Sequence, residues 1–226
     1  MTGFKDLSKF EQAKIEKLKI SILMPTYNDV KYLGNAIRSV LNQTHENFEL
    51  IIVDDGSDYD TAEIIETFDD SRIEYLRLEE NQGQLNALAK GAELVKGEYV
   101  TLLHSDDEFL DRDALQRTVS LLAHSDCQGV YADIQKMNEE GEFTGTSKVI
   151  DAVNAFSPAL LFLRGASNFV SDVFFVKREA FPNIVDNYIT WNMPYWLKFS
   201  ENKIDTLSLL KTHPWYKYRV YSENYS

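Results

Sequence analysis

The chain has few of the residues that are typical of disulfide-rich or low-complexity proteins. Its 226 residues include one cysteine, five prolines and ten glycines. A single cysteine, Cys127, excludes an intramolecular disulfide and a cluster of thiolate metal ligands, and this usage is typical of a reducing compartment. Because 44% of the residues are hydrophobic, a disordered or collagen-like chain is also excluded. We therefore expect a globular fold in which Cys127 is buried.

Long apolar segments are missing as well. The longest apolar runs, such as residues 159–163, have the size of core segments and fall far short of the roughly 18 residues that a membrane helix needs. Residues 1–19 lack the apolar region of a secretory signal. The sequence therefore predicts a cytoplasmic protein without a membrane span.

Positive charge is scarce, with 23 Lys and Arg against 36 Asp and Glu. This balance lacks the basic surface that nucleic-acid binding requires, so we expect no nucleic-acid partner. The excess lies in residues 54–113, where 18 acids and 5 bases leave a net charge of −13, while the other 166 residues carry 18 of each and are neutral. This block is either a solvated acidic face or a cation site through which an anionic ligand is held.

What the sequence does contain is a repeated alternation of short apolar segments and amphipathic segments. It predicts strands at residues 20–24, 48–53, 73–78 and 99–103, and helices at residues 32–41, 61–68 and 85–95. Helices that alternate with fully apolar strands indicate right-handed crossovers and a mostly parallel sheet covered on both faces. The predicted fold class is therefore α/β with a Rossmann-like sheet. We expect Pro25 to end the first strand, because proline has no N–H to donate.

Beyond residue 110 the alternation is less regular. We expect helices at residues 114–123, 156–163 and 195–199, strands at residues 129–136, 143–148 and 173–176, and an edge strand at residues 215–221. Residues 1–18 have the spacing of an amphipathic lead-in helix. Since no linker divides the rest, residues 19–226 are predicted to form one domain, with a ligand-binding half at 19–110 and a second half at 111–226.

Ligands of parallel α/β sheets bind at the carboxyl ends of the strands. This rule selects the loops at residues 25–29, 54–57 and 104–107. Asp54 and Asp55 can accept hydrogen bonds from a base or a ribose, and the alternative is that one of them only caps the next helix. Tyr27 can stack on a nucleobase, and the backbone N–H groups around Gly83, before a helix, can contact an anion.

Asp106 and Asp107 follow the fourth predicted strand. Their carboxylate oxygens are hard ligands that suit Mg²⁺ or Mn²⁺, whose other ligands are commonly phosphate oxygens and water. Such a metal neutralises charge on a departing nucleoside diphosphate. His104 is an additional candidate ligand, and its alternative role is to support the ligands without touching the metal.

Six segments resemble, in order and spacing, the motifs of family 2 glycosyltransferases with the GT-A fold: ILMPTYN (22–28), AIRSVLNQT (36–44), VDDGS (53–57), NQG (81–83), KGEY (96–99) and SDD (105–107). The resemblance covers about residues 19–123 and continues more weakly at residues 176–180 and 218–220. It implies a metal-dependent, inverting transfer of a sugar from a nucleotide-diphospho-sugar, usually a UDP-sugar, to an acceptor hydroxyl.

The resemblance also implies roles for single residues. By position, Thr26, Tyr27, Asp29 and Asp55 would hold the nucleoside, and Asp106 would bind Mg²⁺ or Mn²⁺. Together with the strand-end loops, the candidate donor-binding set is Pro25, Thr26, Tyr27, Asp29, Asp54, Asp55, Gly83, Ser105 and Asp106. Residues 19–110 would then bind the donor and residues 111–226 a glycan or lipid-linked glycan acceptor, with at most peripheral contact at the inner face of the membrane.

Three positions depart from the family pattern. His104 stands where many members carry Asp, and Gln82 stands where many carry Lys or Arg. Asn192 lies in the region of the acidic pair that supplies the general base, and an amide cannot accept a proton at neutral pH. Asp186 is the nearest carboxylate and our candidate base, with His213 as a more distant candidate. The open alternative is a non-catalytic domain that binds a nucleotide-sugar or serves as a scaffold.

Overall fold

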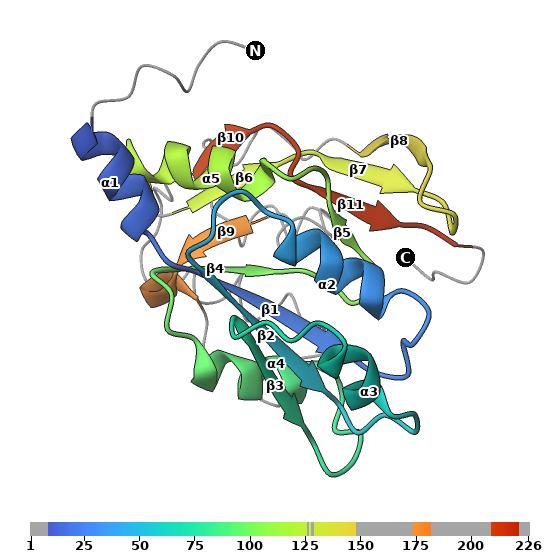
Figure 1. Ribbon diagram of the computed structural model, residues 1–226. Helices are drawn as coiled ribbons and strands as arrows, with labels where there is room; N and C mark the ends of the chain where they lie inside the picture. Colours follow the sequence, from blue (N-terminus) through green and yellow to red (C-terminus); the bar gives the residue numbers. More distant parts are fainter. Residues whose placement is uncertain (1–8, 126, 128, 148–173, 182–208, 222–226) are drawn as a thin grey trace, which may run out of the picture.

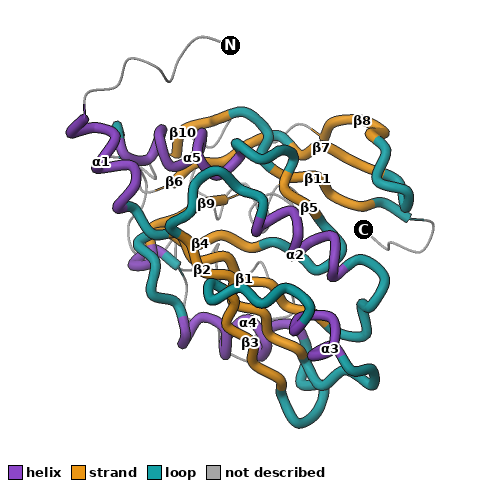
Figure 2. The backbone as a smooth tube through the Cα atoms, in the orientation of Figure 1, coloured by secondary structure: helices purple, strands orange, loops and turns teal. Residues whose placement is uncertain are grey.

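The computed structural model describes residues 9–125, 127, 129–147, 174–181 and 209–221 (Figure 1, Figure 2). Its elements are, in chain order, α1 (Lys9–Lys17), β1 (Ile20–Thr26), α2 (Leu33–Leu41), β2 (Phe48–Asp54), α3 (Thr61–Glu66), β3 (Ile73–Arg77), α4 (Gln84–Leu94), β4 (Tyr99–Leu102), β5 (Glu108–Phe109), α5 (Ala114–Ala123), β6 (Gly129–Ala132), β7 (Ile134–Met137), β8 (Phe143–Ser147), β9 (Phe174–Lys177), the 3₁₀ turn η2 (Arg178–Ala180), β10 (Leu209–Thr212) and β11 (Tyr216–Arg219).

The strands form two sheets. The larger sheet has the order β10-β6-β9-β4-β1-β2-β3, and the smaller one has the order β5-β11-β7-β8. In the larger sheet β9 is antiparallel to β4 and β6, whereas the other described pairings are parallel. The predicted α/β class with a mostly parallel sheet is confirmed.

The centre of the core is the pair β1 and β2, in which every residue is buried. Strands covered by helices on both faces are mostly apolar on both faces, which explains the apolar runs Ile22–Met24 and Leu50–Val53. The steps from β1 to β2 and from β2 to β3 run in one direction across the sheet, and α4 then returns the chain to β4 on the other side of β1. With right-handed crossovers, α4 covers the face opposite to α2 and α3. This reversal opens a crevice at the carboxyl ends of β1 and β4.

The prediction that Pro25 ends the first strand is wrong, because β1 continues to Thr26. Along a strand, the backbone N and C=O groups of every second residue point to the same side. Those of Pro25 therefore face β4, as those of Leu23 do. Leu23 O accepts the N–H of Leu103 at 3.0 Å, and β4 itself ends at Leu102. Pro25 therefore lies beyond the end of the neighbouring strand β4, where its missing N–H costs no hydrogen bond of the sheet.

Two strand predictions in the second half are also wrong. The single strand expected at residues 129–136 is divided into β6 in the larger sheet and β7 in the smaller one. The expected edge strand at residues 215–221 is β11, which pairs with β5 on one side and β7 on the other. A burial pattern indicates which side chains face the core, but it does not indicate how many neighbours a strand has.

Other elements were not predicted or cannot be compared. The short strands β5 and β10 were missed, because two and four residues are too few to show a period. The helices expected at residues 156–163 and 195–199 lie outside the described residues. Of the lead-in helix, α1 covers Lys9–Lys17, and Cys127 is buried as expected. None of the described helices is long and apolar enough to cross a bilayer.

Candidate functional site

The turn after β2 is built around a buried carboxylate. Asp54 Oδ1 accepts hydrogen bonds from the Ser57 N–H at 2.9 Å and the Ser57 hydroxyl at 2.6 Å, and its Oδ2 accepts from the Tyr75 hydroxyl at 3.0 Å. Gly56 has a φ of +70°, and a Cβ on it would lie 2.5 Å from the carbonyl carbon of Glu80. The turn therefore requires glycine, and Asp54 uses both of its oxygens to hold the turn.

That turn presents Asp55 to the crevice. The Asp55 N–H donates to Thr26 O at 2.9 Å, and Asp55 Oδ1 accepts from the Gln82 N–H at 2.9 Å. These two bonds join the ends of β1 and β2 to the loop before α4. No described group donates to Oδ2 of Asp55, so this oxygen is available to a ligand.

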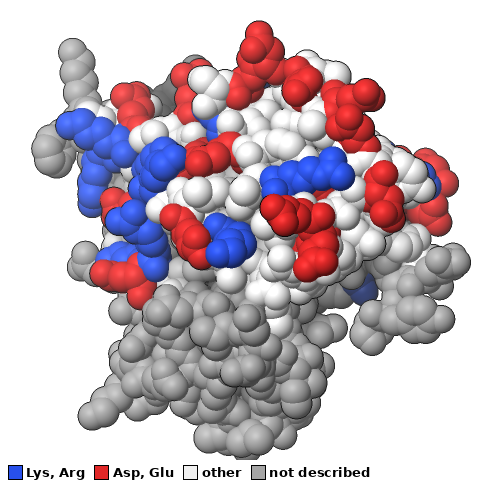
Figure 3. Space-filling view, turned by 90° about the horizontal axis from the view of Figure 1, so that it is seen from below, with Lys and Arg blue, Asp and Glu red and all other residues white. Residues whose placement is uncertain are grey.

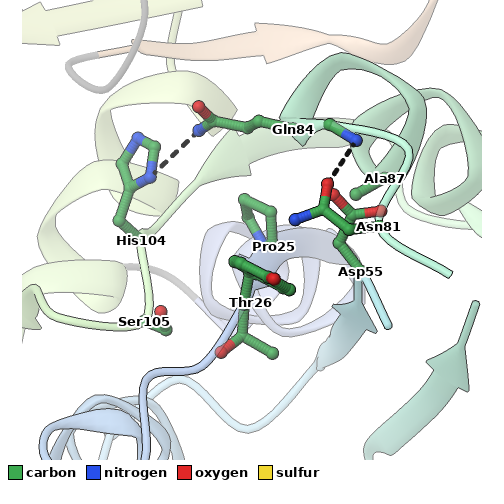
Figure 4. Close-up of a pocket in the computed structure, with 10 residues that line it drawn as sticks. Pro25, Thr26, Asp55, Asn81, Gln84, Ala87, His104 and Ser105 are labelled. Atoms are coloured by element: carbon green, nitrogen blue, oxygen red, sulfur yellow. Dashed lines mark hydrogen bonds between the residues drawn. The ribbon is translucent and has the colours of Figure 1, made fainter. Parts of the chain in front are cut away.

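A pocket of about 300 Å³ lies at the carboxyl ends of β1 and β4 (Figure 4). It is lined by residues from four segments of the chain: Pro25, Thr26, Tyr27, Asp55, Asn81, Gly83, Gln84, Ala87, His104 and Ser105. The predicted donor-binding residues that do not line it are Asp29, Asp54 and Asp106. The structure thus brings together candidates from all three strand-end loops and from the start of α4.

Two groups at this edge of the sheet are suited to a ligand. Thr26 Oγ1 is buried and has no hydrogen-bond partner among the described residues. Leaving such a group unsatisfied costs about 1–3 kcal/mol, and a ligand hydroxyl or carbonyl would remove that cost. Tyr27 is 45% exposed and lines the pocket, so its ring can stack on a ligand.

The sequence reasoning missed two lining residues, Gln84 and Ala87. They lie three residues apart in the first turns of α4 and therefore share one face of the helix. Gly83 precedes α4 with a φ of +88°, so the helix begins at the carboxyl edge of the sheet. A helix that starts there presents its first turn to the crevice. The three-residue spacing of Gln84 and Ala87 at the start of the predicted helix was therefore the sequence signal that could have found them. Across the pocket, Gln84 Nε2 lies 3.3 Å from His104 Nδ1 (Figure 4).

The second acidic pair lies between β4 and β5. Asp107 is fully buried, and its Oδ1 accepts from the Arg219 N–H at 2.8 Å. Asp106 is partly buried, and its Oδ2 accepts from the Tyr221 hydroxyl at 3.1 Å. In the part of the chain that the structure describes, no group donates to Asp106 Oδ1. One oxygen of Asp106 is therefore open, whereas Asp107 holds the backbone of β11.

Asp29 lies close enough to Asp106 for the two carboxylates to interact electrostatically. Burial raises the pKa of the Asp29 carboxyl, and the negative charge of Asp106 adds to the increase, while contacts with Ser105 and Tyr32 oppose it. Asp29 Oδ1 accepts from the Tyr32 N–H at 3.2 Å, whereas its Oδ2 is buried without a hydrogen-bond partner among the described residues. Two carboxylates that repel each other favour a cation or a hydroxyl donor nearby.

The resemblance implies a divalent metal ion, which Asp106 and the side chains around it would have to hold. Among the described residues, no three His, Cys, Asp or Glu side chains converge as a ready-made metal site. Asp106 offers one open carboxylate oxygen, and Mg²⁺ is commonly held by one or two carboxylates with phosphate and water as its other ligands. The residues therefore fit a cation that binds together with a diphosphate.

The acidic block of residues 54–113 contains side chains of two kinds. Asp55 and Asp106 belong to the site just described, whereas Glu63, Glu79 and Glu80 are exposed. Figure 3 shows acidic side chains along the right-hand and upper margins of one face, while basic side chains gather toward its left. The exposed acids fit the interpretation as a solvated acidic face, whereas the cation-site interpretation stays a prediction that concerns Asp55 and Asp106.

Of the two candidate general bases, only His213 lies within the described residues. Asp186 and Asn192 lie outside the described residues. His213 is exposed and does not line the pocket.

The chain is similar in sequence to several glycosyltransferases. Residues 21–185 match the model of the family described as Glycosyl transferase family 2. The chain is 35% identical over 175 residues to an uncharacterized glycosyltransferase of Haemophilus influenzae, covering 73% of this chain and 66% of that protein. It is 30% identical over 133 residues to the Escherichia coli UDP-Glc:alpha-D-GlcNAc-diphosphoundecaprenol beta-1,3-glucosyltransferase WfgD, covering 58% and 52% of the two chains.

The fold also has solved counterparts. The crystal structure of S. aureus TarS 1-349 matches with a TM-score of 0.69 and 16% identity, covering 89% of this chain and 60% of that one. The same protein in complex with UDP matches with a TM-score of 0.69 and 18% identity, covering 90% and 61%. This likeness supports the GT-A-like fold, and the chain spans less than two thirds of the length of each of these relatives. Because the family model matches most of its length, the chain is a member of glycosyl transferase family 2.

Proposed function

We propose that this chain forms the donor-binding and catalytic unit of an inverting, metal-dependent glycosyltransferase. It would move a sugar from a nucleotide-diphospho-sugar, a UDP-sugar, to a hydroxyl of a glycan or glycolipid. The observation that carries the proposal is the pocket between β1 and β4, which has Asp55 on one wall and the Asp106 turn beside it. This is the position at which open parallel sheets bind nucleotides.

In the proposed complex the nucleoside lies at the ends of β1 and β2. Asp55 Oδ2 would accept from an N–H of the base, and the exposed ring of Tyr27 would stack on it. Thr26 Oγ1 and Asp29 Oδ2, both buried and without a described partner, would bind polar groups of the nucleoside.

The charge of the pocket supports the metal dependence. Its described lining contains no Lys or Arg, and it contains the carboxylate of Asp55. A diphosphate that enters such a pocket needs a counter-charge, and Asp106 Oδ1, with His104 as an additional candidate, would hold Mg²⁺ or Mn²⁺ there. When bound, this ion would act as a Lewis acid that neutralises the leaving diphosphate. The N-terminus of α4 would add a favourable dipole, since Gly83 and Gln84 line the pocket.

The proposed reaction is a single displacement. The acceptor oxygen would form a bond to the anomeric carbon as the bond to the diphosphate oxygen breaks on the opposite face, and the hydroxyl proton would pass to a base. We propose Asp186 as that base. The names of the relatives support the substrate classes, because WfgD acts on a diphosphoundecaprenol-linked sugar and TarS has been crystallised with UDP and with UDP-GlcNAc. A cytoplasmic protein in peripheral contact with the membrane would meet such an acceptor.

Calorimetry with UDP, in the presence and absence of Mn²⁺, tests the proposal. We expect Mn²⁺ to strengthen UDP binding by at least about 10-fold, and Asp106→Asn to remove that gain. Uridine, which has no phosphate, should bind the Asp106→Asn variant as it binds the wild type. Equal UDP affinity with and without Mn²⁺ in the wild type would reject the metal assignment. Metal-coupled binding without any donor hydrolysis or transfer would instead favour the non-catalytic alternative.

A further inference from the structure

One buried arginine connects the Asp106 turn to three other parts of the molecule. The Arg219 side chain is 1% exposed, and its Nε donates to the backbone oxygen of Asp106 at 2.8 Å. One terminal nitrogen donates to Glu108 Oε1 at 2.9 Å, and the other donates to the Glu139 carbonyl at 2.8 Å and the Asn138 carbonyl at 3.1 Å. A planar guanidinium with five donors can make this set of bonds, whereas an ammonium group cannot.

Two tyrosines complete the arrangement. The Arg219 guanidinium carbon lies 4.1 Å from the centroid of the Tyr32 ring, and the Tyr221 ring stacks on Tyr32 with centroids 6.4 Å apart and planes at 16°. The Tyr221 hydroxyl donates to Asp106 Oδ2. Asp106 is thus fixed at its backbone by Arg219 and at one carboxylate oxygen by Tyr221.

We propose that Arg219 and Tyr221 are positioning residues that orient the Asp106 carboxylate, so that its free Oδ1 points toward the incoming cation. This inference rests on the proposed metal-dependent function. A carboxylate with one oxygen already bonded to a fixed donor loses less rotational freedom when the other oxygen binds a metal. Partners of metal ligands commonly contribute about 10–100-fold to metal affinity or activity.

A merely structural role would have a different signature. If the two residues only joined β11 to the rest of the fold, removing the Tyr221 hydroxyl would lower the thermal midpoint and leave the dependence of UDP binding on Mn²⁺ unchanged. If they position Asp106, the Mn²⁺ dependence changes as well. The loss of one hydrogen bond lowers the stability slightly in either case, while the ring and its stacking on Tyr32 remain.

The experiment uses the full chain with Tyr221→Phe, and Tyr59→Phe as the matched control. Tyr59 is 57% exposed and its ring lies outside the contacts described above. For each protein, UDP binding is titrated at a series of Mn²⁺ concentrations, uridine binding is measured without metal, and the thermal midpoint is recorded. We expect Tyr221→Phe to raise the Mn²⁺ concentration for half-maximal UDP affinity by about 10-fold, with uridine affinity as in the wild type and in Tyr59→Phe. The thermal midpoint should fall only slightly, as the loss of one hydrogen bond requires.

The outcomes separate this inference from the proposed function. If Asp106→Asn loses the Mn²⁺ effect and Tyr221→Phe keeps it, the positioning role is overturned while the metal function stands. If wild-type UDP binding ignores Mn²⁺, both are overturned. Should Tyr221→Phe unfold, Arg219→Lys provides the same readout, because it keeps the charge but loses the fork of donors. A wild-type Mn²⁺ dependence in that variant would then refute the inference.

Discussion

In both acidic pairs at the carboxyl edge of the sheet, one aspartate holds the fold and the other keeps an open oxygen. The two pairs, however, are supported by different parts of the chain. In each pair one carboxylate is fully buried and serves the fold, namely Asp54 and Asp107. The other, Asp55 or Asp106, keeps one oxygen without a described partner. Side chains of one type near equivalent strand ends thus take different roles: the first aspartate of the Asp54–Asp55 pair and the second of the Asp106–Asp107 pair hold the fold, and the other aspartate of each pair keeps an open oxygen.

The difference between the pairs is where their supports lie in the sequence. Asp54 and Asp55 are held by groups 3, 21 and 27 residues away, on Ser57, Tyr75 and Gln82. Asp106 and Asp107 are held from β11 and Tyr221, 112 to 115 residues away. The first pair therefore belongs to the β1-β2-β3 region alone, whereas the second requires the smaller sheet to be in place.

The largest effect is expected from Arg219→Ala. Removing this buried cation takes one donor from Glu108 Oε1 and from the carbonyl oxygens of Asp106, Asn138 and Glu139, and breaking such an arrangement costs about 3–5 kcal/mol. Urea unfolding measures the loss. Arg38→Ala is the control, because Arg38 is exposed, donates a hydrogen bond to Asn35 and lies over the Phe68 ring, without a buried ion pair among the described residues. A loss below about 1 kcal/mol, the range of an exposed contact, would show that β11 does not support the second pair.

A substitution at Gly56 is the most direct way to disrupt the turn that holds Asp54 and Asp55. An alanine there combines positive-φ strain of about 1–2 kcal/mol with overpacking against Glu80 and Asn81, which costs about 1–3 kcal/mol. We expect Gly56→Ala to destabilise the protein and to abolish uridine binding, measured by urea unfolding and NMR titration. Gly141→Ala separates the two causes, because Gly141 has a φ of +86° with no atom within 4 Å of its would-be Cβ. Equal losses in both variants would contradict the steric argument.

Glu49 is a reference for the two pairs, because it lies far from both of them. Both of its carboxylate oxygens accept hydrogen bonds. Its oxygens accept from Lys19 Nζ at 2.7 Å, the Ser21 hydroxyl at 2.5 Å, and the Lys96 and Gly97 N–H groups at 2.6 and 3.2 Å. We expect Glu49→Gln to cost about 1–3 kcal/mol at pH 7 and to leave uridine and UDP binding unchanged. Glu93→Gln, at an exposed ion pair with Lys90, is the control.

The same carboxylate predicts a pH dependence. Burial alone would raise the pKa of Glu49, but hydrogen bonds from Lys19, Ser21 and the Lys96 N–H outweigh it, so the pKa is lowered from its ordinary value of 4.5. A lowered pKa in the folded state means that the stabilisation is present above pH 4.5 and is lost as the pH falls below it toward the folded-state value. Unfolding of the wild type between pH 7 and pH 3 should show this loss, and Glu49→Gln should show less of it. Parallel curves for the two proteins would contradict the assignment.

The smallest effect is expected from Tyr75→Phe, the counterpart of Tyr221→Phe at the first pair. It removes the hydroxyl that donates to Asp54 Oδ2 and should cost about 1 kcal/mol, measured by thermal and urea unfolding. Because Asp54 holds a turn and faces no cation, the Mn²⁺ dependence of UDP binding should stay as in the wild type. A shift in that dependence would mean that the two pairs are coupled.

The sequence by itself determined the strands of the central sheet and the loops that form the site. Continuous apolar runs predicted β1, β2 and β4, and helical spacing predicted α5 with the bounds observed, Ala114–Ala123. These signals are local, because burial on both faces or on one face sets the sequence pattern within a few residues. Since parallel strands end at one edge, Thr26, Asp55 and Ser105 were predicted to meet, and they line one pocket.

Only the tertiary structure decided which aspartate of each pair is enclosed and what holds Asp106. Antiparallel pairing places Phe109 opposite Tyr216 and Glu108 opposite Lys217, and this register carries Arg219 and Tyr221 to the Asp106 turn. No local pattern reports a contact between residues more than one hundred positions apart, since a single buried arginine looks the same in sequence as an exposed one. The part of the site around Asp55 is therefore indicated by local sequence patterns, whereas the part around Asp106 forms only after β11 has paired with β5 in the smaller sheet.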